Sequence, residues 1–378
     1  MSQILRYANP ISILSGTIIG AGMFSLPFVF ERAGFFLGLA YLLFFTFVFY
    51  ITHSMYADIM LRTEKLPGFS IYAREYLGAW AVLPAAIATV LGILLTSTIY
   101  LVLSFSFARL VLPGIPEELI VYPFWFLGSL GIFLKIKRIA TLEFLVIFSM
   151  AAILGVIFFL SLLFGKFDAH NFVFAPESMM LFFLPFGPAL FSLSGRSAIP
   201  ALIADAKENK ISTSHLPSII FYGTAIPSVF YLAFVLSIWG LSGVVSEDAV
   251  SGISYGGNTL IRILGLIGIA SLFKTYIPIN LSVKNILETD FGFSHFRSGL
   301  FVVFVPIIIY LTKVSFLDLV NIVGGFFLAT ESIIIALIWV KLNKINKPRI
   351  LIKKFGNRTA YIIIAIFVIG LISEFLYS

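Results

Sequence analysis

The sequence contains no cysteine and few charged residues. Of its 378 residues, 11% are Asp, Glu, Lys or Arg, whereas soluble globular proteins carry about 25%. Without cysteine, a disulfide framework and thiolate metal ligation are both excluded. The four histidines are scattered and never lie four residues apart, so they predict neither a metal nor a haem site. So few charges cannot cover a soluble protein of this size, which indicates lipid as the solvent.

Long apolar runs are what the sequence has instead. Hydrophobic residues make up 60% of the chain, 42 of them Phe, and the mean hydropathy is +1.06. A helix needs roughly 20 apolar residues to cross a bilayer. The sequence predicts an all-α integral membrane protein with eleven transmembrane helices, at residues 9–30, 34–61, 79–110, 119–135, 139–164, 179–204, 217–241, 256–285, 299–312, 315–341 and 359–377.

The distribution of Lys and Arg between the predicted loops gives an orientation. With the N-terminus in the cytoplasm, eighteen of the 25 basic residues fall in inside loops and four outside. The positive-inside rule therefore predicts a cytoplasmic N-terminus and a C-terminus outside. The net charge of +7 follows from the same bias, so no nucleic-acid partner is expected.

Residues 1–378 form one transmembrane domain, because no loop is long enough to fold separately. Residues 69–78 between the second and third spans are compatible with a short interfacial helix. No HExxH, GxSxG or phosphate-binding motif is present, so the sequence does not predict an enzyme. We expect a multi-pass protein of the cell membrane, surrounded by lipid, monomeric, and without a cofactor or a metal site.

Two of the predicted spans contain residues that interrupt a helix. The first span has Gly16, Gly20 and Gly22 near the bilayer midplane, followed by Pro27. Glycine costs about 1 kcal/mol per residue in a helix interior relative to alanine. The sixth span, within 184–200, has three prolines, two glycines and three serines. Both spans are therefore predicted to be broken near their middle.

Broken helices at membrane depth occur where the freed backbone groups line a cavity or face protein. A half-helix N-terminus attracts an anion, and loose carbonyls coordinate cations. The two broken spans are five spans apart and start on opposite sides, as expected for inverted repeats with a binding site between them. The alternative interpretation is that these glycines allow close helix packing and nothing more.

The two interrupted stretches resemble motifs of a known family. GTIIGAGMFSLP (residues 16–27) resembles the first-span motif of the amino acid/auxin permease family, particularly its bacterial aromatic and hydroxy amino acid permeases. FSLSGRSAIP (residues 191–200) is similar to the family's sixth-span motif. The resemblance implies the LeuT-type fold of the APC superfamily. In that fold, two inverted five-helix repeats, here 9–164 and 179–341, precede an eleventh helix, 359–377.

The resemblance also implies substrate-binding residues. The backbone at Ala21 and Gly22 would receive the substrate carboxylate, and the sixth span would hold the amino group and set the side-chain pocket. On the first span the implied residues are Thr17, Gly20, Ala21, Gly22 and Met23. On the sixth span they are Phe191, Ser192, Ser194, Gly195 and Arg196.

Ion coupling is where the sequence departs from sodium-coupled relatives. Carbonyls of Gly16 and Ile19 would form half of their sodium site, but span eight offers Lys274 and Thr275 where two hydroxyls are expected. The Lys274 ammonium could replace sodium or lose its proton during transport; alternatively, it pairs with Glu331 or faces water. Glu331 is a candidate proton relay or a structural ion-pair partner. Arg196 is expected to contact an acidic substrate, pair with an acid as a gate, or reach cytoplasmic water.

These observations predict a secondary transporter that moves amino acids, neutral or aromatic, by alternating access. Coupling to protons, or no ion coupling, fits the lysine better than coupling to sodium. A sodium-coupled symporter and a non-transporting amino acid sensor of the same fold stay open as alternatives. A divalent-metal transporter would need carboxylate or thioether ligands at the first break, where Met23 alone is present.

Overall fold

The computed structural model describes residues 3–63, 68–133, 153–166, 179–255, 257–345 and 348–377. Within these ranges the chain is all-helical and contains no strand. A single antiparallel bridge joins Ser242 to Ile253 in the loop before α12. The first part of the predicted fifth span, 139–152, lies outside the described residues.

The N-terminal half contains the first interrupted segment, two long helices and shorter elements around them. Its elements are α1 (Gln3–Ile18), η1 (Ala21–Ser25), α2 (Leu26–Ala33), α3 (Phe35–Thr63), α4 (Phe69–Leu77), η2 (Ala79–Ala81), α5 (Val82–Val111), α6 (Glu118–Phe133) and the helix Ile153–Phe164. The short α4 occupies the stretch for which the sequence suggested an interfacial helix.

The C-terminal half begins with a second interrupted segment. Its elements are α8 (Met179–Phe183), α9 (Phe186–Leu193), η4 (Arg196–Ala198), α10 (Ile199–Glu208), η5 (Thr213–His215), α11 (Leu216–Leu241), α12 (Asn258–Thr289), α13 (His295–Leu311), α14 (Phe316–Asn321), η6 (Ile322–Leu328), α15 (Ala329–Lys344) and α16 (Asn357–Tyr377). Here η6 is a π-helical stretch that joins α14 to α15. Such stretches occur frequently at functional sites.

Several of these helices are long and apolar enough to cross a membrane. Within the described ranges, six meet that requirement alone, and the bent pair Arg6–Ile18 and Ala21–Ala33 makes a seventh if it is one span. The two helices of this pair meet at 48°. Three further apolar helices are shorter, so the predicted number of eleven spans stays a prediction.

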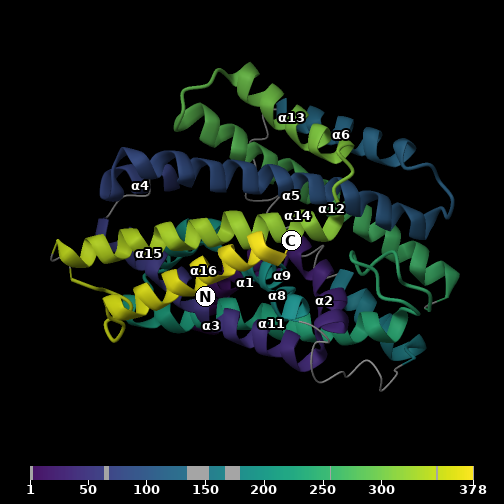
Figure 1. Cartoon of the computed structure of the whole chain (residues 1–378), viewed down its shortest axis with the longest axis horizontal. Coiled ribbons are helices and arrows are strands. Elements are labelled where there is room, and N and C mark those ends of the chain that lie inside the picture. Colours follow the sequence, from purple (N-terminus) through teal and green to yellow (C-terminus); the bar gives the residue numbers. More distant parts are fainter. Residues whose placement is uncertain are drawn as a thin grey trace.

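The helices are arranged around α5. Figure 1 shows α6 and α13 on one side of α5 and α1, α3 and α11 on the other, while α12 packs against α5 itself. The N-terminal α1 packs against α10 and α11, so the first half of the first interrupted segment lies beside the second half of the second. α9 packs against η6, and α15 packs against α3, α4 and α16.

A buried carboxylate on α3 holds the segment that follows α15. Asp58 of α3 is fully buried and accepts hydrogen bonds from the indole N–H of Trp339 and from the backbone N–H groups of Ile350 and Leu351. A buried carboxylate must be satisfied in this way because desolvation is costly. Asp58 therefore holds the segment after α15 against α3 and has a structural role.

Candidate functional site

The first interruption separates α1 from η1. The last helical hydrogen bond of α1 runs from the Ile19 N–H to the Ser15 carbonyl, and Gly20 is extended with φ −143° and ψ −161°. The following helix begins at Ala21, so the first amides of this new helix have no preceding turn to bond to. Ala21 and Gly22 are buried at this point, and their amides form a buried half-helix N-terminus.

Gly22 marks the closest approach between the two interrupted segments. A Cβ at this position would lie 2.7 Å from the Ser192 Cα and N atoms and 2.9 Å from the Phe191 carbonyl carbon. These are backbone atoms, so they cannot move aside as the tip of a side chain could. Glycine fits at position 22 because the Cβ of any larger residue would clash with the backbone of the second segment.

The second interruption lies between α9 and η4. α9 ends at Leu193, Ser194 is extended, and the next helical turn starts at Arg196. The N–H of Gly195 donates to the Nε2 atom of His53, 3.1 Å away on α3. A histidine more than a hundred residues away in the chain therefore accepts a hydrogen bond from the buried amide of this break.

Tyr231 of α11 joins the two interruptions. Its side chain is fully buried, and its hydroxyl lies 2.6 Å from the Ile18 carbonyl oxygen and 2.7 Å from the Ser192 carbonyl oxygen. The single hydroxyl proton is shared between these two acceptors, one from each break. Tyr231 was not among the residues that the sequence suggested, because its contacts depend on how three distant helices meet.

A buried ion pair lies directly after the second break. The Arg196 Nε donates to the Glu331 Oε2 at 2.8 Å and its Nη2 donates to Oε1 at 2.7 Å, a two-point contact between η4 and α15. Thr89 of α5 donates to Glu331 Oε1 at 2.7 Å, and the guanidinium lies 4.5 Å from the centre of the Phe69 ring. The two side chains are 15% and 6% exposed.

The pairing selects among the alternatives that the sequence left open. Arg196 pairs with an acid, Glu331 is the acid, and Glu331 does not pair with Lys274. Lys274 is exposed and has no hydrogen bond or ion pair with any residue that the structure describes, whereas its neighbour Thr275 is buried. α12 packs mainly against α5, α6 and α13. Ion coupling through Lys274 stays a prediction, and its exposure argues against a buried ion site at this ammonium.

The other predicted residues differ in burial along the first break. Thr17 is exposed, and its hydroxyl donates to the Ile13 carbonyl. Ile19 and Gly20 are half-buried, whereas Gly16 and Met23 are buried. Thr17 is therefore the one exposed side chain among the predicted residues before the break, and the predicted residues after it are buried.

Burial also varies along the second break. Phe191 and Ser194 are half-buried, and Ser197, just beyond the break, is exposed. Ser192 is buried, and its hydroxyl donates to the Pro188 carbonyl in the preceding turn. Ser192 therefore presents its backbone, rather than its hydroxyl, to the first segment.

Together the two breaks place backbone hydrogen-bond donors of one helix end beside backbone hydrogen-bond acceptors of two other helix ends. The helix beginning at Ala21 presents amide N–H groups, whereas α1 and α9 end in carbonyls. A half-helix N-terminus favours negative charge and a half-helix C-terminus favours positive charge. This arrangement matches a zwitterion.

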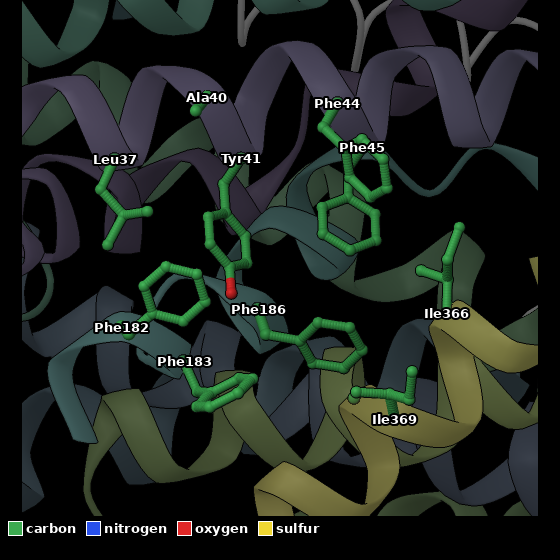
Figure 2. A pocket seen from close by; sticks show the side chains of 11 residues that line it. Leu37, Ala40, Tyr41, Phe44, Phe45, Phe182, Phe183, Phe186, Ile366 and Ile369 are labelled. Atoms are coloured by element: carbon green, nitrogen blue, oxygen red, sulfur yellow. The ribbon is translucent and has the colours of Figure 1, made fainter. Parts of the chain in front are cut away.

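An apolar groove lies elsewhere, between α3, the α8–α9 segment and α16 (Figure 2). It has a volume of about 410 Å³ and is lined mainly by aromatic and aliphatic side chains. Among the labelled side chains in Figure 2, the Tyr41 hydroxyl supplies the one polar atom. A zwitterion needs several donors and acceptors, so this groove does not match one.

Comparison with known proteins identifies the family. A model of the tryptophan/tyrosine permease family matches residues 7–374. The chain belongs to this family. The members of the tryptophan/tyrosine permease family are membrane transporters of amino acids and not enzymes, as the sequence predicted.

Individual relatives agree with this assignment. The chain is 26% identical to the tryptophan-specific transport protein of Shigella flexneri, over 76% of this chain and 73% of that protein. The crystal structure of the Eremococcus coleocola manganese transporter, in complex with an aromatic bis-isothiourea substituted compound, shares the fold. Its TM-score is 0.62 at 15% identity, over 98% of this chain and 87% of that one.

Proposed function

We propose that this permease carries tryptophan or tyrosine across the cell membrane by alternating access. The observation that carries the proposal is the meeting of two helix interruptions at Gly22 and Ser192, joined by the Tyr231 hydroxyl. The family and the tryptophan-specific relative support an aromatic amino acid as the substrate.

The substrate binds between the two breaks as a zwitterion. Its carboxylate accepts hydrogen bonds from the amides at Ala21 and Gly22, the start of the outer half of the first span. Its ammonium donates to carbonyls at the end of α9, around Phe191 and Ser194. The half-buried Phe191 ring is placed to contact an aromatic side chain, which prefers offset or edge contacts.

The surrounding architecture is the LeuT-type arrangement of two inverted five-helix repeats plus an eleventh helix. In this proposal α1 with η1–α2 is the first span, and α8–α9 with η4–α10 is the sixth. The N-terminus is cytoplasmic and the C-terminus outside, as the distribution of Lys and Arg predicts.

In the proposed orientation, the side of the two breaks that faces the cytoplasm is the more accessible one. Thr17 and Ser197, on the N-terminal side of the first break and the C-terminal side of the second, are both exposed. In the proposed orientation both face the inner half of the membrane. Met23 and Phe24, on the outer side of the first break, are fully buried. Water and substrate would therefore exchange with the inside in this state.

The Arg196–Glu331 pair is formed in this conformation. The pair joins the sixth span to the tenth and, through Thr89, to the third. Separating it would leave a charge buried and unpaired, which is strongly unfavourable. The pair therefore keeps these three spans together while α1 and α10 move, so that it acts as a fixed point of the transport cycle.

Uptake of labelled amino acids into proteoliposomes tests the proposal. The panel contains tryptophan, tyrosine, leucine and Mn²⁺, each with an inward proton gradient, an inward sodium gradient or neither. We expect saturable uptake of tryptophan or tyrosine, driven by protons rather than sodium. Mn²⁺ uptake is not expected, because no group of three or more His, Asp or Glu side chains in the described ranges could hold a metal. Amino acid binding without uptake would favour the sensor alternative.

A further inference from the structure

His53 is a buried ionisable side chain whose two ring nitrogens are both bonded. It lies within α3, is 1% exposed, and its ring is tilted against the Phe49 ring with 5.5 Å between centroids. An ionisable side chain at membrane depth is expected to have a function, because it is costly to bury there.

The hydrogen bonds around His53 assign its tautomer. Thr224 of α11 donates its hydroxyl proton to the Ile220 carbonyl at 2.9 Å, so its oxygen accepts from the Nδ1–H of His53 at 3.2 Å. The Nε2 atom is then unprotonated and accepts the Gly195 N–H. His53 is therefore neutral, with its single ring proton on Nδ1.

This geometry links the charge of His53 to the second helix break. A proton arriving on Nε2 would point at the Gly195 N–H, placing two donors face to face. The Gly195 amide would have to leave, and the break would change its position relative to α3. A histidine exposed to water gains or loses a proton near neutral pH, so protonation of the buried His53 requires a conformation that opens its ring to water.

We propose that His53 is the residue that carries the coupled proton during transport, and that binding of this proton releases Gly195 from α3. The proton enters from the outer solution onto Nε2 and leaves to the cytoplasm when Nε2 again accepts the Gly195 N–H. The inference rests on the proposed function, since it assigns the coupling site of that same permease.

The packing around Gly195 carries its movement to the first break. A Cβ at Gly195 would lie 2.6 Å from Ile18 Cγ1 and 2.9 Å from Leu14 Cδ1, so the break touches the last turns of α1. The next residue, Arg196, is held by Glu331. Release of Gly195 therefore changes what α1 packs against, while Arg196 stays fixed.

The charged groups on the elements packed around His53 do not replace it in this role. Among the described residues, Arg196 and Glu331 neutralise each other, Asp58 is fully hydrogen-bonded, and Asp205 of α10 accepts from Asn9. Tyr231 is bonded to carbonyls, and Tyr56 lies beside the Arg196 guanidinium. The other ionisable residues on these elements are Glu31, Arg32, Tyr41, Tyr50, Arg62, Lys207, Glu208, Tyr222, Lys341 and Lys344.

The decisive variant is His53→Gln, because glutamine can accept from Gly195 and donate to Thr224 but does not titrate. His215→Gln is the matched control, since His215 is exposed at the start of α11. In proteoliposomes, tryptophan counterflow at equal pH is compared with accumulation driven by an inward proton gradient. Because glutamine holds the Gly195 N–H at every pH, we expect His53→Gln to lose counterflow and proton-driven accumulation by about tenfold or more, whereas His215→Gln keeps both. Proton-driven accumulation at the wild-type level in His53→Gln would overturn the inference.

Hydrogen exchange of the wild-type protein tests the linkage without transport. We expect a peptide containing Gly195 to exchange faster, after correction for intrinsic rates, as pH falls from about 8 to about 5. Unchanged protection over this range would overturn the inference, whether or not His53→Gln folds. If the wild type shows this change but takes up no amino acid, the proposed function fails while the proton-linked release of Gly195 stands.

Discussion

The two helix interruptions are built differently. The first, at Ile19 and Gly20, is surrounded by backbone: the Ser192 main chain lies against Gly22, and Tyr231 bonds to the Ile18 carbonyl. The second, at Ser194 and Gly195, is surrounded by ionisable side chains: His53 bonds to the Gly195 amide, and Glu331 pairs with Arg196.

This difference suits the two breaks to different steps of the proposed transport. Backbone amides hold a fixed partial charge and do not titrate, so the first break is suited to bind the carboxylate that every amino acid carries. Side chains that gain protons or pair with one another can switch, so the second break is suited to link binding to movement and to protons.

Removing one partner of the ion pair should have the largest effect. Glu331→Gln leaves the Arg196 guanidinium buried without a counter-charge, which costs about 3–5 kcal/mol for a buried pair. We expect a large fall in the thermal unfolding temperature in detergent. Glu208→Gln at the exposed end of α10 is the control and should change nothing. Equal stability of Glu331→Gln and the wild type would mean that the second break does not depend on this pair.

A methyl group at the first break should have the next largest effect. Gly22→Ala places a Cβ 2.7 Å from the Ser192 backbone, and such overpacking costs about 1–3 kcal/mol. We expect tryptophan uptake to be lost. Gly20→Ala is the matched control, because its Cβ would meet nothing closer than 3.8 Å and its φ of −143° suits alanine. If both variants transport equally well, close backbone approach is not what the first break requires.

Loss of the hydroxyl that joins the two breaks should have a smaller effect. Tyr231→Phe removes the bond shared by the Ile18 and Ser192 carbonyls, worth about 1 kcal/mol. We expect a modest decrease in unfolding temperature and a several-fold lower uptake rate. Tyr222→Phe, exposed on the same helix, serves as the control. A larger defect in Tyr222→Phe than in Tyr231→Phe would argue against a link between the breaks.

The smallest effect is expected at Lys274. The side chain is exposed and has no partner among the described residues, and surface substitutions usually change stability by less than about 0.5 kcal/mol. Lys274→Ala should therefore fold as the wild type does. Because the ammonium contacts no partner among the described residues, the variant should also keep the proton dependence of uptake. Uptake that became sodium-dependent in this variant would instead place Lys274 at the ion site and move coupling away from the second break.

Glycines lie at both breaks that the structure describes between short helices, whereas two broken transmembrane spans stay a prediction. Glycine and proline at midmembrane depth break a helix because of their own backbone properties, so Gly20 and Gly195 were both among the predicted residues. The ion-pair partner could not be chosen in the same way. Arg196 and Glu331 are 135 residues apart, and only the packing of α15 against the second break brings them together.

Side-chain direction explains where the sequence was less informative. Lys274 and Thr275 are neighbours on α12, and consecutive residues of a helix point about 100° apart, so one is exposed while the other is buried. His53 could have been noticed, because an ionisable residue inside a long apolar helix is itself a signal. The spacing of the four histidines tests for a metal site and gives no information about a single buried histidine such as His53.

The most direct test of the account is uptake of labelled tryptophan and tyrosine by the purified wild-type protein in proteoliposomes, beside Gly22→Ala and Gly20→Ala. We predict saturable uptake that an inward proton gradient drives and an inward sodium gradient does not, present in Gly20→Ala and absent in Gly22→Ala. No saturable uptake of either amino acid by the wild type, under any gradient, would contradict it.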